Sequence, residues 1–199
     1  MKAFNIFLIL IILFASFSCR KEIIIDEGYG LDDWTYVTHS ANADPDYSTV
    51  FPQDKVNRLD IVIESDYWQI MQDDLENLMQ QNQFSEESPI YAPCQVFFEG
   101  IQWYDVGIRY KGNSSLMSAF REGIHKLPLR LEFDHFDNDN AAISGQRFYG
   151  FNQLSLGNNF KDVSFVHEKV ATDTYRDFGV PCSETAFYEI YIDHGEGSI

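Results

Sequence analysis

The chain has little positive charge. Only 14 lysine and arginine residues stand against 31 acidic ones among 199 residues, and the formal net charge is −17. A nucleic-acid partner needs basic side chains beside its phosphates, so this balance argues against DNA or RNA binding. It argues equally against a polybasic attachment to anionic lipid. Hydrophobic residues make up 45% of the sequence, which excludes wholesale disorder and allows one packed domain, or the front part of a larger one.

Several catalytic signatures are also missing. No G-x-G-x-x-G, H-E-x-x-H or G-x-S-x-G pattern occurs, so the sequence lacks the marks of a dinucleotide fold, a zinc protease and an α/β-hydrolase. Residues 107–114 resemble a phosphate loop, but Asn113 replaces its lysine and the match lies mostly in a predicted strand. The histidines are scattered, and Asp134, Asp137 and Asp139 lack the glycine and distal glutamate of a calcium loop. We therefore expect no metal site.

The hydrophobic stretch near the N-terminus is too short for a comfortable membrane span. It covers Ile6–Phe17 and follows Lys2, which is typical of an export signal. The four residues ending in Cys19 resemble a bacterial lipobox, whose cysteine is acylated after cleavage. We expect residues 1–18 to be a signal peptide and Cys19 to carry the lipid, the only membrane attachment. An ordinary secretory signal is the alternative. Both place the protein outside the cytoplasm, at the bacterial envelope or surface.

Cysteine is scarce, with three residues in the chain. In an oxidising compartment Cys94 and Cys182 could form a disulfide, or they could remain two separate buried thiols. Two cysteines alone do not decide between these alternatives.

Residues 22–54 hold eight acidic side chains and no lysine or arginine. This composition predicts a solvated tether over residues 19–54, which lifts a domain over residues 55–199 away from the membrane. Order is expected to begin near Lys55.

The rest of the chain predicts an α+β fold with two main helices and a mostly antiparallel sheet. Alternating and helical hydrophobic spacings give the order strand, helix, hairpin, strand, strand, helix, strand. The expected strands are 59–63, 91–99, 102–111, 126–133, 152–156 and 184–193, and the expected helices are 66–81 and 162–178.

The scarce basic residues gather on two of these strands. Arg109, Lys111, Lys126 and Arg130 make up four of the 14 basic residues, and the alternation places each pair on the polar face of its strand. If the strands are neighbours, the four side chains form a cationic patch that suits a polyphosphate. The alternative is salt bridging to Asp105, Glu132 or the acidic surface.

The strand end at residues 109–115 reads R-Y-K-G-N-S-S. It resembles the R-x-K-G-N-S-S segment of the CotH family, the spore-coat-H-like atypical protein kinases. Further segments follow in the family's order, although Val163 replaces the proline of its D-P-S turn. These segments are Lys126–Phe133, Phe148–Asn159, Asp162–Ser164, Asp177–Pro181 and Glu189–Asp193.

This resemblance implies a kinase-like fold in which residues 55–199 correspond to the nucleotide-facing N-terminal lobe. It implies ATP and Mg²⁺ as cofactors and phosphoryl transfer to an unidentified protein substrate. A lysine at position 111 or 126 would contact the phosphates and pair with a helix glutamate, as in other kinases. The nucleotide-binding residues are then Arg109, Lys111, Lys126, Arg130 and Glu168.

The segment that carries the family's metal-binding aspartates is missing from these 199 residues. We therefore expect a truncated chain that is inactive alone or binds nucleotide only, and we assign no catalytic residue. One alternative is a non-catalytic surface module that binds protein or glycan, suggested by Trp34, Trp68 and Trp103. Another is a gene-model fragment with no role of its own.

Overall fold

The computed structural model describes residues 31–81 and 89–195. The predicted signal peptide and Cys19 lie outside these residues. In the described part of the chain, none of the helices has the length and apolar character needed to cross a membrane.

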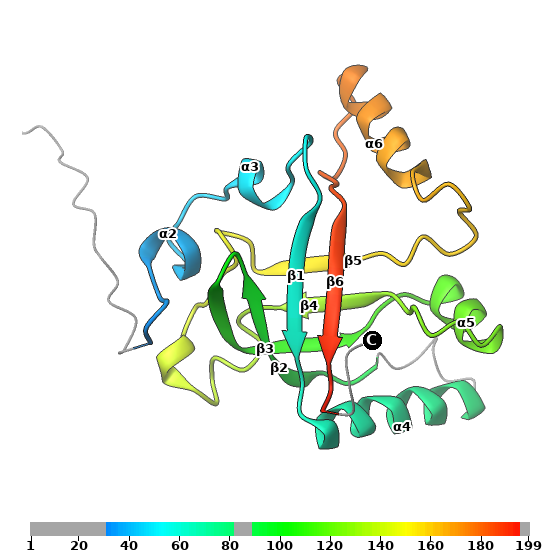
Figure 1. Ribbon diagram of the computed structural model, residues 1–199, viewed down its shortest axis with the longest axis horizontal. Helices are drawn as coiled ribbons and strands as arrows, with labels where there is room; N and C mark the ends of the chain where they lie inside the picture. The colour runs from blue at the N-terminus through cyan, green and yellow to red at the C-terminus, as the bar shows by residue number, and fades with distance from the viewer. Residues whose placement is uncertain (1–30, 82–88, 196–199) are drawn as a thin grey trace, which may run out of the picture.

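Six strands form one sheet in the order β5-β4-β3-β2-β1-β6 (Figure 1). All neighbours are antiparallel except β1 and β6, which run parallel. The sheet is strongly curved, so that β1 and β6 run across β3, β4 and β5. The predicted α+β class with a mostly antiparallel sheet is confirmed. The strands are β1 (Asn57–Val62), β2 (Ala92–Phe98), β3 (Ile101–Tyr110), β4 (Leu129–Glu132), β5 (Gln153–Leu156) and β6 (Tyr188–Asp193).

Five α-helices accompany the sheet in the described residues. They are α2 (Tyr36–His39), α3 (Tyr47–Val50), α4 (Ser65–Gln81), α5 (Ser114–Arg121) and α6 (His167–Asp177). The core forms between α4 and one sheet face, where Met71, Leu75 and Leu78 are buried at helical spacing. Tyr67 and Ile70, which the sequence placed on the same apolar stripe, are exposed.

The β2–β3 hairpin contains a tight turn and a bulge. Glu99 and Gly100 both have positive φ, 51° and 84°, which matches the twist of the flanking strands. Further along, Cys94 pairs with Val106 but Val96 pairs with Trp103, so β3 has one extra residue. This bulge lets Trp103 and Val106 both enter the core, which strict alternation would forbid.

Residues 31–54 pack on the domain instead of forming a tether. Trp34 and Val50 are buried, and the buried ring of His39 stacks between Trp34 and Trp103 at centroid distances of 4.9 and 4.7 Å. The backbone N–H groups of Arg147 and Tyr149 donate to the carbonyls of His39 and Thr38. Order therefore begins well before Lys55, because aromatic residues among the acidic ones find partners far away in the sequence.

The F-Y-G segment anchors this N-terminal part. Phe148 is fully buried, and the carbonyl of Tyr149 accepts from the N–H of Asp46 at 3.0 Å. Gly150 has φ +83°, and a Cβ there would lie 2.7 Å from the Cα of Pro45. The glycine thus allows the two backbones to approach, and this family motif has a structural role.

His39 predicts a pH-dependent stability. Its Nδ1 pairs with the hydroxyl of Thr38 at 2.7 Å and its Nε2 with the carbonyl of Gln102 at 2.9 Å. Burial lowers the pKa of His39 from 6.5 to about 4, although the Gln102 carbonyl and Asp33 oppose the shift. The unfolded chain therefore binds a proton more readily between these pH values. We expect the stabilisation to be complete above pH 6.5 and to decline as the pH falls toward 4, by on the order of 3 kcal/mol.

Urea unfolding of the wild type and of His39→Gln from pH 7.5 to 4 measures this effect. The variant should lose that part of the pH slope, because glutamine does not titrate. Equal slopes for the two proteins would contradict the assignment.

Several element boundaries differ from the sequence prediction. The last strand, predicted from residue 184, begins at Tyr188. Residues 114–121 form α5, where only a turn was expected. The strand predicted from Lys126 begins at Leu129, after Pro128. The second main helix begins at His167, because Asp162 accepts from the N–H groups of Ser164 and His167 and forms a separate turn before it.

Candidate anion-binding site

Arg109 and Arg130 lie side by side on the polar face of the sheet. They are direct cross-strand partners on β3 and β4. Their neighbours along the strands, among them Ile108 and Leu131, are buried in the core, so the arginines point to the other side. The two strands are therefore neighbours, which was the condition for a shared basic face.

The predicted alternative of salt bridging does not occur in the described residues. Within residues 31–81 and 89–195, none of the four basic residues forms an ion pair. Asp105 instead accepts from Gln95 and Asn140. The carboxylate of Glu132 lies 3.5 Å from Nδ1 of His135.

Both guanidinium groups keep an unused donor. The Nε atoms of Arg109 and Arg130 are buried and have no hydrogen-bond partner among the described residues. Arg109 does donate from Nη1 to the carbonyl of Tyr110 at 3.0 Å. A buried donor without a partner costs about 1–3 kcal/mol, and like charges directly opposite on two strands also destabilise a sheet. An anion at this face would relieve both costs.

Lys111 and Glu168 extend the patch from two different elements. Burial lowers the pKa of Lys111, and the charges of Arg130 and Arg109 lower it further, while Glu168 opposes the shift. Glu168 comes from the first turn of α6. Its Oε2 lies 3.4 Å from the point that a Cβ on Gly157 would occupy. The structure thus places the glutamate at the same end of the sheet as Lys111.

Lys126 lies at the rim of the patch and outside the strand. It is exposed in the loop before β4, and its carbonyl accepts from Nδ2 of Asn158 at 2.9 Å. Its ammonium lies 5.0 Å from the ring centroid of Phe165. The predicted place on the polar face of the strand is therefore wrong, because Pro128 separates Lys126 from β4.

Tyr91 and His135 support the arginines, and sequence reasoning missed both. The guanidinium of Arg109 lies 5.1 Å from the ring centroid of Tyr91, and His135 stacks on Tyr91 at 3.9 Å. A Cβ on Gly107 would lie 2.6 Å from the Cβ of His135, so the glycine makes room for the imidazole. Burial and Glu132 raise the pKa of Tyr91, while Arg109 lowers it. A glycine on the polar face of a strand was the only signal in the sequence.

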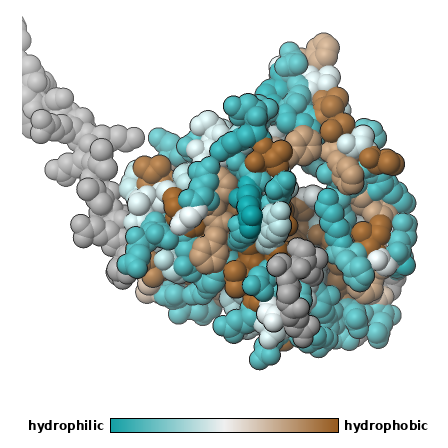
Figure 2. Space-filling model, viewed as in Figure 1, coloured by the Kyte–Doolittle hydropathy of each residue, from teal (hydrophilic) through white to brown (hydrophobic). Residues whose placement is uncertain are grey.

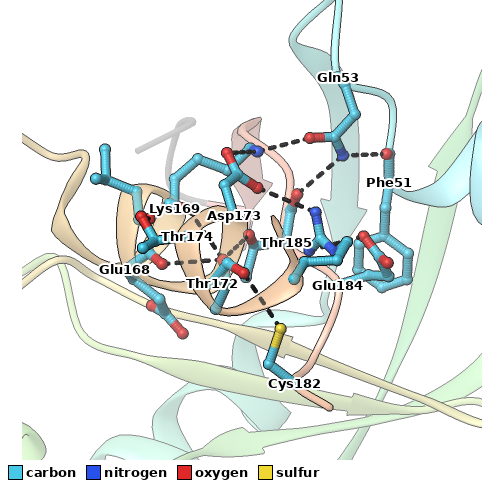
Figure 3. Close-up of polar contacts among 12 residues, drawn as sticks. Phe51, Gln53, Glu168, Lys169, Thr172, Asp173, Thr174, Cys182, Glu184 and Thr185 are labelled. Atoms are coloured by element: carbon cyan, nitrogen blue, oxygen red, sulfur yellow. Dashed lines mark hydrogen bonds and ion pairs between the residues drawn. The ribbon is translucent and has the colours of Figure 1, made fainter. Parts of the chain in front are cut away.

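Polar contacts hold α6, which has no buried residue. Figure 3 shows Lys169 contacting Asp173 and Gln53, and Thr172 contacting Thr185. Arg176 forms a 2.9 Å ion pair with Glu184. The apolar side predicted for this helix is exposed, and Figure 2 shows brown side chains in the region of α6. The exposed apolar side chains include Val166, Val170 and Phe178.

The two cysteines in the described residues are separate thiols. Cys94 is buried in β2 and Cys182 is half-buried. The Cys182 thiol donates to the carbonyl of Thr172 at 3.2 Å. Of the two alternatives that the sequence left open, the structure therefore has free thiols.

Lys169→Met should loosen α6, because it keeps most of the side-chain length but removes the contacts to Asp173 and Gln53. We expect amide exchange in α6 to accelerate about fivefold, because Lys169 is the more buried member of the pair with Asp173. Hydrogen-exchange mass spectrometry measures this. Lys55→Met, which removes the exposed Lys55–Glu99 pair, is the control and should leave α6 unchanged. Similar exchange in the two variants would contradict the expectation.

The described residues thus form an α+β domain with unpaired cations on one sheet face. The family model described as CotH kinase protein matches residues 108–197, from β3 through β6, with all five predicted site residues. This match supports the assignment to the CotH kinase family that the sequence motifs indicated. No curated protein matches the chain.

Proposed function

We propose that the basic patch, formed by Arg109, Lys111, Lys126 and Arg130, binds the phosphates of a nucleotide, with ATP as the ligand. The observation that carries this proposal is the pair of buried, unpartnered Nε atoms on Arg109 and Arg130. A protein of net charge −17 has many carboxylates to neutralise two arginines, and the fold leaves both without one in the described residues. Planar guanidinium groups suit phosphate oxygens because they donate two parallel hydrogen bonds.

In this proposal Lys111, Lys126 and Glu168 have different roles, which follow from their positions. Lys111 is half-buried beside the arginines and adds a fixed charge, whereas the exposed Lys126 reaches the phosphates from the loop before β4. Glu168 favours the charged form of Lys111, because it opposes the lowering of the lysine's pKa. The residues that the structure describes contain no cluster of three or more His, Cys, Asp or Glu side chains suited to a metal ion. We therefore assign no residue to Mg²⁺, which family membership implies in general.

Calorimetric titration of the purified chain with ATP tests the proposal. Lys111→Ala and Lys126→Ala should each weaken binding about tenfold, the effect of losing one hydrogen bond to a charged group. Arg121→Ala, at an exposed arginine in the last turn of α5, is the control and should bind as the wild type does. Absence of binding to any nucleotide would sink the proposal and favour the protein- or glycan-binding module. Incubation with radiolabelled ATP separately measures phosphoryl transfer, for which we expect no turnover by this chain alone.

We further propose that the chain is exported and anchored through lipid on Cys19. The support is the N-terminal sequence: a short apolar stretch that ends in a lipobox-like segment. Metabolic palmitate labelling should mark the wild type and leave Cys19→Ala unlabelled. Labelling that survives the substitution would refute the anchor.

A further inference from the structure

Phe165 is an exposed aromatic residue in a strained backbone position. It lies in the loop between β5 and α6, and 53% of its surface is exposed. Its φ of 59° is in the left-handed region, which bulky residues adopt only at an energetic cost. Neither burial nor backbone preference accounts for a phenylalanine at this position.

Phe165 also lies beside the basic patch. The ammonium of Lys126 is 5.0 Å from its ring centroid. Asn158 and Lys126 hold the two loops together through the 2.9 Å hydrogen bond from Nδ2 to the carbonyl. Three residues after Phe165, Glu168 acts electrostatically on Lys111. The ring thus lies beside Lys126 in space, and Glu168 follows it closely in the sequence.

We propose that the ring of Phe165 stacks on the base of the nucleotide whose phosphates the patch binds. This inference rests on the proposed function and names the residue that distinguishes a nucleotide from free polyphosphate. In the free protein the ammonium of Lys126 covers the ring. A phosphate competes for that ammonium because a full negative charge attracts it more strongly than the π-face of a benzene ring does. The ring is then free to receive a base.

We expect the site to prefer ligands that carry a nucleobase, without distinguishing one base from another. Every nucleobase has a π-face, so stacking on one aromatic ring discriminates little between bases. The exposed neighbours Val163 and Val166 are apolar. The polar neighbours Ser164 and His167 both contact the carboxylate of Asp162. We therefore expect ATP and GTP to bind alike, and both to bind more tightly than inorganic tripolyphosphate.

Titration of the full chain with ATP, GTP and inorganic tripolyphosphate tests this inference. Phe165→Ala should weaken both nucleotides on the order of tenfold, a typical effect of losing one base–aromatic stack, and leave tripolyphosphate unchanged. Phe165→Trp should retain or improve nucleotide binding. Phe178→Ala is the matched control, because Phe178 is 80% exposed and lies at the other end of α6.

The outcomes separate this inference from the proposed function. If the wild type binds nucleotide and Phe165→Ala changes nothing, or weakens all three ligands equally, the stacking role is wrong and the phosphate site stands. Equal affinity of the wild type for ATP and tripolyphosphate also overturns it. A wild type that binds none of the ligands overturns the phosphate site itself.

Discussion

Arg130→Gln should stabilise the free protein while it weakens nucleotide binding. Arg130 faces Arg109 directly across the β3–β4 ladder, and neither forms an ion pair within the described residues. Removing one of two like charges should raise the free energy of unfolding by up to about 1 kcal/mol. The same change removes a charged hydrogen-bond donor from the proposed phosphate site, which should weaken ATP binding by about tenfold or more.

Urea unfolding and calorimetric titration of the same preparations measure the two effects. Arg121→Gln is the control, because it removes the same charge from an exposed helix position and should change neither quantity. A variant that is less stable than the wild type would show that Arg130 has a structural partner. Opposite signs for stability and affinity are what a binding residue predicts.

Gly150→Ala should destabilise the domain by about 3 kcal/mol. One part of this cost is the positive φ of 83°, which a residue with a Cβ adopts at about 1 kcal/mol. The larger part is steric, because the new Cβ would lie 2.7 Å from the backbone N and Cα of Pro45. The backbone of residues 44–46 would have to move, and overpacking of this kind typically costs about 1–3 kcal/mol.

Gly100→Ala is a close control for the steric part. Gly100 has nearly the same φ, 84°, but a Cβ there would meet nothing within 4 Å. It should cost about 1 kcal/mol, from backbone strain alone. Urea unfolding of both variants measures the difference. Equal losses would mean that the N-terminal segment adapts freely and that the contact with Pro45 contributes nothing.

The sheet face of the site could be predicted because strands have a period of two residues. That period alone put Arg109 and Arg130 opposite the buried Ile108 and Leu131. The contacts of Tyr91 with Arg109 and His135 could not be predicted from the sequence. They depend on the pairing of β2 with β3 and on a turn that brings His135 over Gly107. Such contacts follow from register, which composition does not give.

The predictions at the two ends of the domain failed for a different reason. The acidic composition of residues 22–54 suggested a solvated tether, yet a few aromatic residues decide the structure of the part described. Trp34 and His39 are buried against Trp103, about 65 positions further along the chain, as the register of β3 allows. The spacing of Val166, Val170 and Phe178 predicted the presence of the helix correctly, but not the exposure of these side chains. Spacing cannot reveal that polar contacts alone hold α6 in the described domain.

The parallel pairing of β1 with β6 determines when this domain can complete its folding. The pair joins Asn57–Val62 to Tyr188–Asp193, and the hydroxyl of Tyr188 also bonds the carbonyl of Val50 at 2.6 Å. Until β6 is synthesised, one edge of β1 has no strand to pair with, and the segment around Val50 lacks that bond. Contacts so distant in sequence form slowly, and unpaired edges invite aggregation. During synthesis, therefore, β1 needs protection until β6 has appeared and can pair with it.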